Sequence, residues 1–511
     1  MITRIFLLLF CMLCGCLDAE PPKRIRAIYS SLDPLSVSQH LALYQLYPDS
    51  PEGKNALQKA WKLLNTGTIE SQVPTSLTLP VHGIQTIVGI VNKQPFEEPL
   101  QLSDTDLVFV ERMSSRLSNR QLKGYRATSE TEVLALPPHE IDLARGLFLS
   151  QLGDNADSLL TLRNYEAMLD LMALQIQARL DPYATPEDKV HELNRFIFEE
   201  MNFRFPPHSV YAADIDLYTF LPSVLDTRRG VCLGVSVMYL CLAQRLDLNL
   251  EIVTPPGHIY VRYREGGKEI NIETTARGIH IDSEEYLSID TRKLQQRDLK
   301  ETVGLTHINL ASVYLQQGDY PKAVETYKQA EKYLPNDRLL KELLGYSLFL
   351  SGNEKNGRLY LEQVRDYLPD EAVSQNNMVA DLLDGKVDTK GLKSIYMGVD
   401  ETSESLLAKK KALQDALQTH PQFRAGWLQL ATTLLQMHRY GEALECLKRY
   451  HEIHPNNVTA EYFLAIVNAE RLDFNEAWKH LYSAEELLAQ RNHQPKAMAA
   501  FRKQLSIKSP E

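Results

Sequence analysis

The spacing of apolar residues predicts a mainly helical region over residues 17–133. Residues 39–46 and 53–64 both carry apolar side chains at helical intervals. The apolar run 86–91 is rich in β-branched residues and fits either a strand or a short buried helix. The polar stretch 112–132 fits either a long loop or an exposed helix. These patterns indicate helices but do not indicate what kind of domain they form.

Further along the chain, helical spacing gives way to a regular repeat. Pro335 and Pro369 are 34 residues apart, and so are Pro421 and Pro455. This is the period of a helix-turn-helix unit, in which small residues lie where two helices approach closely. An unrelated helical bundle is the alternative, but it would not keep the same phase at independent prolines.

The repeat pattern matches the tetratricopeptide consensus and predicts an α-solenoid over residues 304–490. Residues 371–405 fit the consensus poorly, and residues 491–511 are left as a C-terminal tail. The matching positions in four units are Leu310, Ala311, Tyr314, Gly318, Tyr320, Ala323, Tyr327 and Ala330; Leu344, Gly345, Leu348, Gly352, Gly357 and Leu361; Trp427, Leu430, Ala431, Leu434, Tyr440, Ala443 and Leu447; and Leu464, Ala465, Phe474, Ala477, Leu481 and Ala484.

Between these two regions, Cys232 follows a polar turn at 227–230 and begins an apolar helix that extends to about Leu248. A cysteine at a helix N-terminus faces the positive end of the helix dipole, which favours the nucleophilic thiolate. Taken alone, Cys232 could equally be a small apolar residue at the start of a core helix.

His258 follows a Pro-Pro-Gly sequence and precedes a predicted strand at 259–263. Gly266 and Gly267 predict a turn, and residues 268–274 predict the returning strand of a hairpin. Taken alone, His258 could be an ordinary histidine at the edge of a loop.

Two registers of this hairpin are compatible with an even-numbered turn. If Tyr263 pairs with Lys268, His258 lies directly opposite Glu273. If Glu265 pairs with Lys268, Glu273 lies diagonal to His258 on the same face, and Asn271 lies one step further in both cases. A carboxylate beside an imidazole orients it, and the imidazole in turn activates a thiol. We therefore predict a Cys232–His258–Glu273 set.

This order resembles that of the transglutaminase-like superfamily, whose core is papain-like. The chain is most similar to a bacterial family that fuses such a domain to tetratricopeptide repeats. The resemblance rests on Leu225-Asp226-Thr227-Arg228-Arg229-Gly230, the helix 236–246, Pro256-Gly257-His258 and the strand 259–262.

The resemblance implies an α+β, mostly helical protein with the transglutaminase-like domain over residues 134–297. It also implies that Cys232 is the nucleophile, His258 the general base and acid, and Glu273 the orienting acid, where the superfamily usually has aspartate. The backbone N–H of Cys232 would help to stabilise the oxyanion. The expected activity is attack on an amide or peptide carbonyl, with a thioester intermediate that water or an amine resolves.

The first residues resemble a lipoprotein signal. Arg4 precedes the apolar run 5–13, which is shorter than the roughly 20 residues that a membrane span needs. Leu13-Cys14-Gly15-Cys16 is similar to the bacterial lipobox, which implies cleavage and acylation of Cys16 as the first mature residue. By the same resemblance, Leu17 after the acylated cysteine implies the outer membrane over the inner one, with the soluble part in the periplasm.

The remaining cysteines are Cys232, Cys241 and Cys446, an odd number that argues against a disulfide scaffold. The net charge of −11 argues against nucleic-acid binding. Lys409, Lys410 and Lys411 are expected on a solvated helix face. No phosphate loop, dinucleotide fingerprint or zinc-ligand spacing is present in the sequence, so no cofactor or metal is expected.

Two functions remain open. One is an envelope-anchored thiol enzyme whose repeats hold a protein or peptide partner in their groove. The other is a non-catalytic scaffold in which the domain and the repeats only bind proteins.

Overall fold

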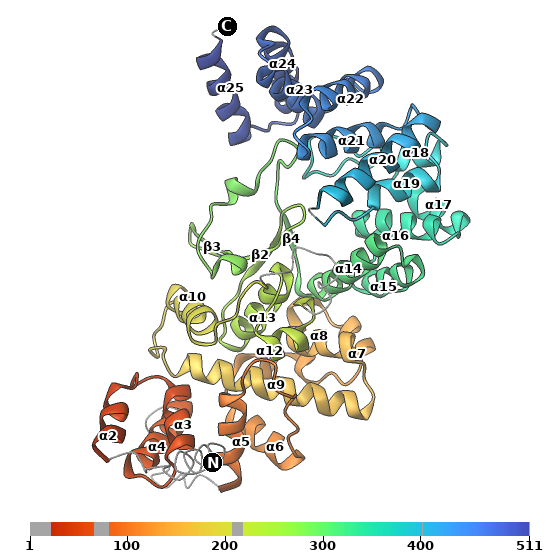
Figure 1. Cartoon of the computed structure of the whole chain (residues 1–511). Helices are drawn as coiled ribbons and strands as arrows, with labels where there is room; N and C mark the ends of the chain where they lie inside the picture. The colour runs from red at the N-terminus through yellow and green to blue at the C-terminus, as the bar shows by residue number, and fades with distance from the viewer. Residues whose placement is uncertain (1–21, 66–80, 207–217, 401, 510–511) are drawn as a thin grey trace, which may run out of the picture. The chain divides into compact units, whose positions relative to one another are not determined.

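The computed structural model describes residues 22–65, 81–206, 218–400 and 402–509. These residues are mostly helical, with one small antiparallel sheet (Figure 1), which confirms the predicted fold class. The expected signal segment and Cys16 lie outside the described residues. Within them, every helix is too short or too polar to cross a bilayer.

The chain divides into two compact units. One comprises residues Met1–Leu117 together with Ala167–Glu192, and the other comprises Ser118–Glu166 together with Leu193–Glu511. The long helix α9 (Ala156–Gln177) contributes its first part to the second unit and its remainder to the first.

The N-terminal unit contains several helices, two of which begin at side-chain caps. Ser36 accepts a hydrogen bond from the Gln39 N–H, and Ser103 forms a capping box with Asp106. The apolar run 86–91 belongs to a helix and not to a strand, with Ile87, Ile90 and Val91 buried at helical spacing. The helices are α2 (Pro22–Ser31), α3 (Val37–Leu46), α4 (Pro51–Asn65), α5 (Val81–Asn92) and α6 (Asp104–Met113).

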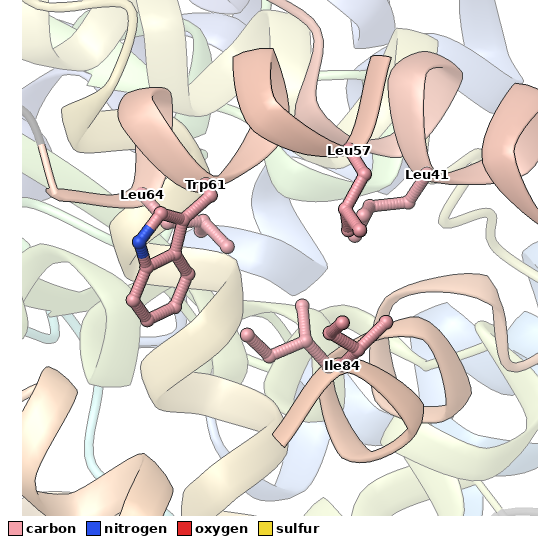
Figure 2. A pocket seen from close by; sticks show the side chains of 6 residues that line it. Leu41, Leu57, Trp61, Leu64 and Ile84 are labelled. Carbon is pink, nitrogen blue, oxygen red and sulfur yellow. The ribbon is translucent and has the colours of Figure 1, made fainter. Parts of the chain in front are cut away.

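An apolar pocket lies among three of these helices. Figure 2 shows the side chains of α3 and α4 on one side and those of α5 facing them. The Trp61 ring stacks on Phe109, with centroids 6.2 Å apart. The lining residues are Leu41, Leu57, Trp61, Leu64, Ile84 and Ile87.

The polar stretch 112–132 is neither one loop nor one helix. It contains the end of α6, two 3₁₀ turns at Ser118–Gln121 and Lys123–Arg126, and the start of α7 (Glu130–Ala135). Asn119 is fully buried and donates to Asp142, the N-cap residue of α8 (Leu143–Leu152).

Helices α10, α12 and α13 precede the sheet. Helix α10 (Pro186–Asn194) continues into a π-helical turn at Arg195–Glu200. Beyond it come α12 (Leu221–Thr227) and α13 (Cys232–Arg245). All residues of α13 except Cys232 and Gln244 are buried, as expected for a helix that the rest of its domain surrounds.

The sheet has the strand order β3-β2-β1-β4, and all its neighbours are antiparallel. Glu265 pairs with Lys268, which selects the second of the two predicted registers. Gly266 and Gly267 both have positive φ, at 58° and 85°, as a two-residue turn of type I′ requires. The strands are β1 (Glu251–Thr254), β2 (Tyr260–Glu265), β3 (Lys268–Ile272) and β4 (Gln295–Arg297).

The C-terminal part of the chain consists of consecutive antiparallel helices (Figure 1). Glycine allows close packing between α16 and α17, because a Cβ on Gly345 would lie 2.6 Å from Leu361 Cδ2. The predicted small positions Ala311, Ala323 and Ala330 are fully buried. The repeat helices are α14 (Leu299–Gln317), α15 (Tyr320–Tyr333), α16 (Arg338–Leu350), α17 (Glu354–Glu362), α20 (Ser403–Thr419), α21 (Arg424–Gln436), α22 (Tyr440–Ile453), α23 (Val458–Glu470) and α24 (Phe474–Gln490).

The poorly matching stretch forms two short helices, α18 (Met378–Leu383) and α19 (Thr389–Tyr396). The expectation that Lys409 to Lys411 form a solvated face is wrong for Lys409. Its side chain is buried, and Nζ donates to the carbonyl oxygens of Ile395 and Met397 at 3.2 and 3.0 Å. These carbonyls supply the polar contacts that a buried ammonium needs.

The segment described as a tail contains a further helix, α25 (Lys496–Lys508). Its Met498 and Leu505 join the apolar core of the last repeat. The indole N–H of Trp478 donates to the carbonyl oxygen of Ser509 at 3.1 Å. Helix α25 therefore covers the end of the repeat array, which would otherwise expose an apolar face.

The turn between paired helices has positive φ at equivalent positions. Gly318 and Gly352 have φ of 83° and 86°, whereas Leu472 has φ of 65° and a 72% exposed side chain. A leucine in the left-handed region destabilises the folded state by about 1–2 kcal/mol. Glycine removes this strain, but its greater freedom in the unfolded chain offsets part of the gain. We expect Leu472→Gly to raise the free energy of unfolding by about 0.5–1 kcal/mol.

Chemical denaturation of Leu472→Gly, Leu472→Ala and the parent checks this expectation. Alanine also removes most of the exposed side chain but keeps the Cβ that makes the conformation costly. A stability gain in both variants would attribute the effect to the exposed leucine and not to the backbone.

Candidate active site

The start of α13 is fixed by the segments that precede it. The Val231 N–H donates to the carbonyl oxygen of Tyr218 at 3.0 Å. Gly234, one turn further, lies so close to the same carbonyl that a Cβ would come within 2.2 Å of its oxygen. A larger residue at 234 would displace the helix start, and with it Cys232, the first residue of α13.

The turn before Cys232 is held in a similar way. Arg228 adopts the left-handed conformation at the end of α12, with φ of 53°. Arg204 brackets this turn through two backbone hydrogen bonds, to the carbonyl oxygen of Arg228 at 3.0 Å and from the N–H of Gly230 at 3.2 Å. The position of the cysteine is therefore set by backbone contacts on both sides of the turn.

His258 lies in the turn that leads into β2. Its N–H donates to the carbonyl oxygen of Pro255 at 3.0 Å, and Gly257 has φ of 70°. Its Nε2 lies 2.6 Å from Glu273 Oε2, with the two side chains 27% and 5% exposed. The prediction that the hairpin places Glu273 beside His258 is confirmed. Asn271 lies away from this contact and bonds to Ile281 and Ser283 instead.

The Glu273 carboxylate is surrounded by donors. Thr275 donates from its backbone N–H and from its hydroxyl to Oε1, at 3.1 and 2.5 Å. Tyr286 donates its hydroxyl to Oε2 at 2.5 Å, on the oxygen that also meets His258. Both carboxylate oxygens are thus engaged, which fixes the orientation of the group.

Tyr286 is a member of this site that the sequence analysis missed. Its ring stacks on His258 and on Tyr260, with centroids 5.7 and 4.6 Å away. It follows Glu273 by 13 residues, in a 3₁₀ turn (Ser283–Tyr286) with no repeat or motif around it.

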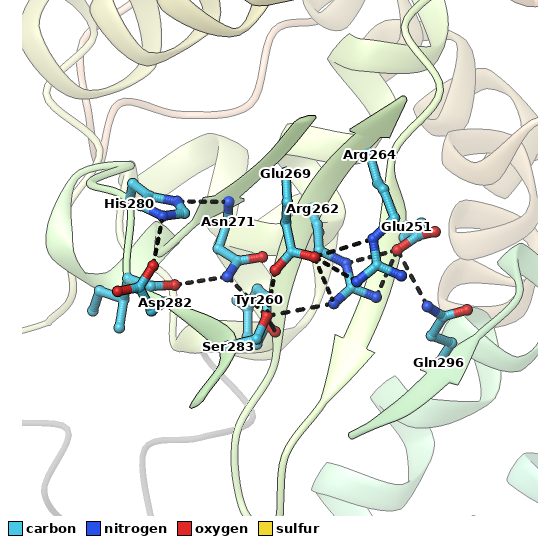
Figure 3. Close-up of polar contacts among 11 residues, drawn as sticks. Glu251, Tyr260, Arg262, Arg264, Glu269, Asn271, His280, Asp282, Ser283 and Gln296 are labelled. Atoms are coloured by element: carbon cyan, nitrogen blue, oxygen red, sulfur yellow. Dashed lines mark hydrogen bonds and ion pairs between the residues drawn. The ribbon is translucent and has the colours of Figure 1, made fainter. Parts of the chain in front are cut away.

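A polar network holds the loop that carries Tyr286 (Figure 3). Arg262, only 4% exposed, binds Glu251 at 2.7 Å, and the Ser283 hydroxyl donates to Glu269 at 2.6 Å. Figure 3 shows Ser283 in contact with side chains of both β2 and β3, among them Tyr260 and Asn271. These contacts attach residues 279–286 to the sheet and so bring Tyr286 to His258.

The electrostatics of the pair follow from these contacts. Burial would lower the pKa of His258, but hydrogen bonds with Cys232 and Glu273 outweigh it and raise the pKa to about 10. Burial would raise the pKa of Glu273, but hydrogen bonds from His258, Thr275 and Tyr286 lower it to about 2. At neutral pH the two groups are therefore an imidazolium and a carboxylate.

Cys232 contacts the His258 imidazole on the side of the ring opposite Glu273. Because Nε2 is taken by Glu273, Nδ1 is the ring nitrogen that remains for the thiol. The Thr274 hydroxyl reaches the carbonyl oxygen of Cys232 at 3.5 Å and the Ser236 hydroxyl at 3.0 Å, which connects α13 to the turn after β3. The three predicted residues thus lie together.

The other two cysteines differ from Cys232 in exposure. Cys241 and Cys446 are buried, whereas Cys232 is partly accessible. Burial raises the pKa of Cys241 far above its usual range and that of Cys446 to about 11. A partly exposed thiol beside an imidazole can act as a nucleophile, and buried protonated thiols cannot.

The raised pKa of His258 predicts a specific response to Glu273→Gln. Without the carboxylate charge the imidazolium keeps its hydrogen bond with Cys232 but loses the contribution of Glu273, so the pKa of His258 should fall below about 10. NMR titration of the imidazole, assigned with His258→Ala, measures the change. An unchanged pKa in Glu273→Gln would contradict the role given to this contact.

The pair also has a predictable effect on stability. His258 has a raised pKa, so its contribution is complete below about pH 6.5 and is lost as the pH rises toward 10. Glu273 has a lowered pKa, so its contribution is complete above pH 4.5 and is lost as the pH falls toward 2. Both contributions are complete between about pH 4.5 and pH 6.5, so the difference in the free energy of unfolding between the parent and Glu273→Gln should be largest in that range.

Tyr286→Phe tests the fourth residue of the site. The substitution keeps the stack on His258 but removes the hydroxyl that orients Glu273. We expect iodoacetamide to alkylate Cys232 more slowly, by roughly tenfold or less, because one hydrogen bond to a charged group is lost. Tyr263→Phe is the matched control, since it removes a β2 tyrosine hydroxyl that donates to the carboxylate of Glu265 and not to that of Glu273. Equal rates for the two variants would count against this assignment.

Comparison with known protein families gives three matches. A model described as the transglutaminase-like superfamily matches residues 163–315, which include Cys232, His258 and Glu273. Models described as the tetratricopeptide repeat match residues 304–337 and 424–467. A comparison with curated proteins gave no significant match.

Solved structures give partial likenesses. One described as MamA MSR-1 C2 is 20% identical, covers 37% of this chain and 97% of its own, and has a TM-score of 0.19. Another, MamA 41-end from Desulfovibrio magneticus RS-1, is 15% identical, covers 37% and 96%, and has a TM-score of 0.20. The family matches and the described fold agree: this chain joins a domain of the transglutaminase-like superfamily to tetratricopeptide repeats.

Proposed function

We propose that this protein is a thiol enzyme that acts on an amide or peptide bond through a thioester at Cys232. The observation that carries the proposal is the contact chain from Cys232 to His258 to Glu273, at the start of a buried helix. A structural cysteine would need neither a charged imidazole nor a carboxylate held by three other hydrogen-bond donors.

In the first half of the reaction, the Cys232 sulfur would attack the carbonyl carbon as a thiolate. The carbonyl oxygen would then carry negative charge, and the N–H groups in the first turn of α13 have no acceptor within the helix. Those of Cys232 and Leu233 would therefore be available as donors. The intermediate would collapse by breaking the C–N bond, with the His258 imidazolium giving its proton to the leaving amine.

In the second half, the neutral imidazole would accept a proton from water or from an acceptor amine. The resulting nucleophile would attack the thioester carbonyl, and the C–S bond would break to restore the thiolate and the imidazolium. Glu273 would hold the ring in place through both proton transfers and stabilise its charged form. Hydrolysis and acyl transfer differ only in the second nucleophile.

The repeats would bind a protein or peptide partner. A cavity of about 290 Å³ lies among α14, α20, α21 and the segment that follows α19. Gln316, Gln429 and Gln436 contribute amide groups to its lining. Side-chain amides both donate and accept hydrogen bonds, which suits them to an extended peptide backbone.

We further propose that acylation of Cys16 anchors the protein in the bacterial cell envelope, at the outer membrane more than at the inner one. Several acyl chains together hold a protein on a bilayer where one chain would not. The enzyme and the repeats would then act in the periplasm, near the membrane surface.

The pH dependence of Cys232 alkylation tests the proposed chemistry. The chain would lack residues 1–16 and carry Cys241→Ser and Cys446→Ser, so that only Cys232 reacts. We expect rapid alkylation at neutral pH that slows strongly in His258→Ala, because the imidazole no longer stabilises the thiolate. Thermal melting of each variant shows whether it is folded.

A slow thiol that is indifferent to His258 would overturn the proposal. The protein would then be better described as a scaffold that binds partners through both its domain and its repeats. A fast, His258-dependent thiol would justify a search for the acyl substrate among peptides and amines.

A further inference from the structure

A second cluster of titratable side chains lies within the repeats. His451 belongs to the last turn of α22, Glu461 to the start of α23, and His480 to α24. His451 Nδ1 lies 2.5 Å from Glu461 Oε1, and His480 Nδ1 lies 2.8 Å from Glu461 Oε2. One ligand atom from each residue lies within 4.8 Å of the other two.

Two residues of the cluster are buried and the third is partly exposed. The side chains of Glu461 and His480 are 1% and 9% exposed, whereas that of His451 is 37% exposed. A buried carboxylate requires compensating positive charge or several hydrogen bonds. The partly exposed imidazole of His451 provides a path from solvent to the buried pair.

The orientation of the two rings is the feature that points to a metal. Both present Nδ1 to the same carboxylate, and the rings are perpendicular, with centroids 5.5 Å apart. The other nitrogen of His480 faces Glu476 Oε2 at 3.7 Å. A carboxylate behind a histidine is the usual partner of a metal-bound imidazole, because it fixes the tautomer and orientation of the ring.

We propose that His451, Glu461 and His480 form a binding site for a divalent transition metal, with Zn²⁺ the best match. Two imidazoles and one carboxylate are a known zinc ligand set that leaves a fourth position for water or another donor. With ligand bonds of about 2.0–2.2 Å, tetrahedral ligand atoms would be separated by about 3.3 Å. The present 2.5 and 2.8 Å contacts would therefore open slightly, and His451, whose side chain is 37% exposed, is the ligand with the most room to move.

Binding exchanges protons for the metal. Each Nδ1 that now meets the carboxylate would offer its lone pair to the ion instead, and its proton would move to Nε2 or to solvent. Glu476 Oε2, 3.7 Å from His480 Nε2, would then face the protonated nitrogen and accept a hydrogen bond from it. The ion would then join three helices of two successive repeats near the end of the array.

No spacing of residues in the sequence indicates this site. Its ligands are separated by 10 and 19 residues and come from three different helices. Spacing rules find zinc ligands that share one short turn or helix, and this set forms only when the repeats pack. The proposal does not depend on the chemistry of Cys232.

Zn²⁺ binding to the full chain tests the proposal. All variants would carry Cys232→Ser, so that the thiol of the other site cannot bind the metal. Equilibrium dialysis with elemental analysis measures bound Zn²⁺, and thermal melting with and without Zn²⁺ measures stabilisation. We expect one equivalent that raises the melting temperature, and loss of both effects in His451→Ala and in Glu461→Gln.

Two further variants sharpen the result. His438→Ala removes an exposed histidine of the same repeat and should leave binding unchanged. Glu476→Gln should weaken binding by about 10–100-fold, as expected for the partner of a metal-bound histidine. Glu461→Gln keeps a side chain of the same shape, so loss of binding in a variant that melts normally cannot come from misfolding. Absence of binding in the parent, or equal binding in all variants, would overturn the proposal.

Discussion

The candidate active site depends on keeping a carboxylate charged where water barely reaches it. Glu273 is 4% exposed, and burial alone would favour its neutral form. Thr275, Tyr286 and His258 reverse this by donating hydrogen bonds to its two oxygens. The negative carboxylate then stabilises the positive imidazolium of His258, and the same ring contacts the Cys232 thiol. Each step requires the previous one.

The position of the thiol has a separate origin. Helix α13 is buried almost along its whole length, so its axis is set by core packing and not by the site. Gly234 and the Tyr218 carbonyl then set where the helix starts. The sheet brings His258 and Glu273 to that start through the register of β2 and β3. Apolar packing thus fixes one half of the site, and backbone pairing fixes the other.

Features that are set by residues close together in the sequence could be predicted, and features that depend on contacts with distant segments could not. The hairpin could be predicted because two adjacent glycines and an alternating pattern restrict the register to two possibilities, which both bring Glu273 to His258. The repeats could be predicted because their spacing recurs. Tyr286 could not, since it reaches the site only through a loop that Ser283 and Arg262 attach to the sheet. Lys409 was misjudged for the same reason: its acceptors are carbonyls of another helix end.

The way the acid is held changes where strand pairing stops. The pairing of β2 with β3 ends at Val261 and Ile272, and Glu273 follows directly after it. The chain then enters a 3₁₀ turn at Thr274–Ala276, with Glu273 as its N-cap residue. The ladder therefore brings Glu273 near His258, but side-chain contacts orient the carboxylate: Thr275 donates to Oε1 from its N–H and its hydroxyl, and Oε2 meets His258. Because the same carboxylate caps the turn and binds the imidazole, losing it would release the turn as well as the ring.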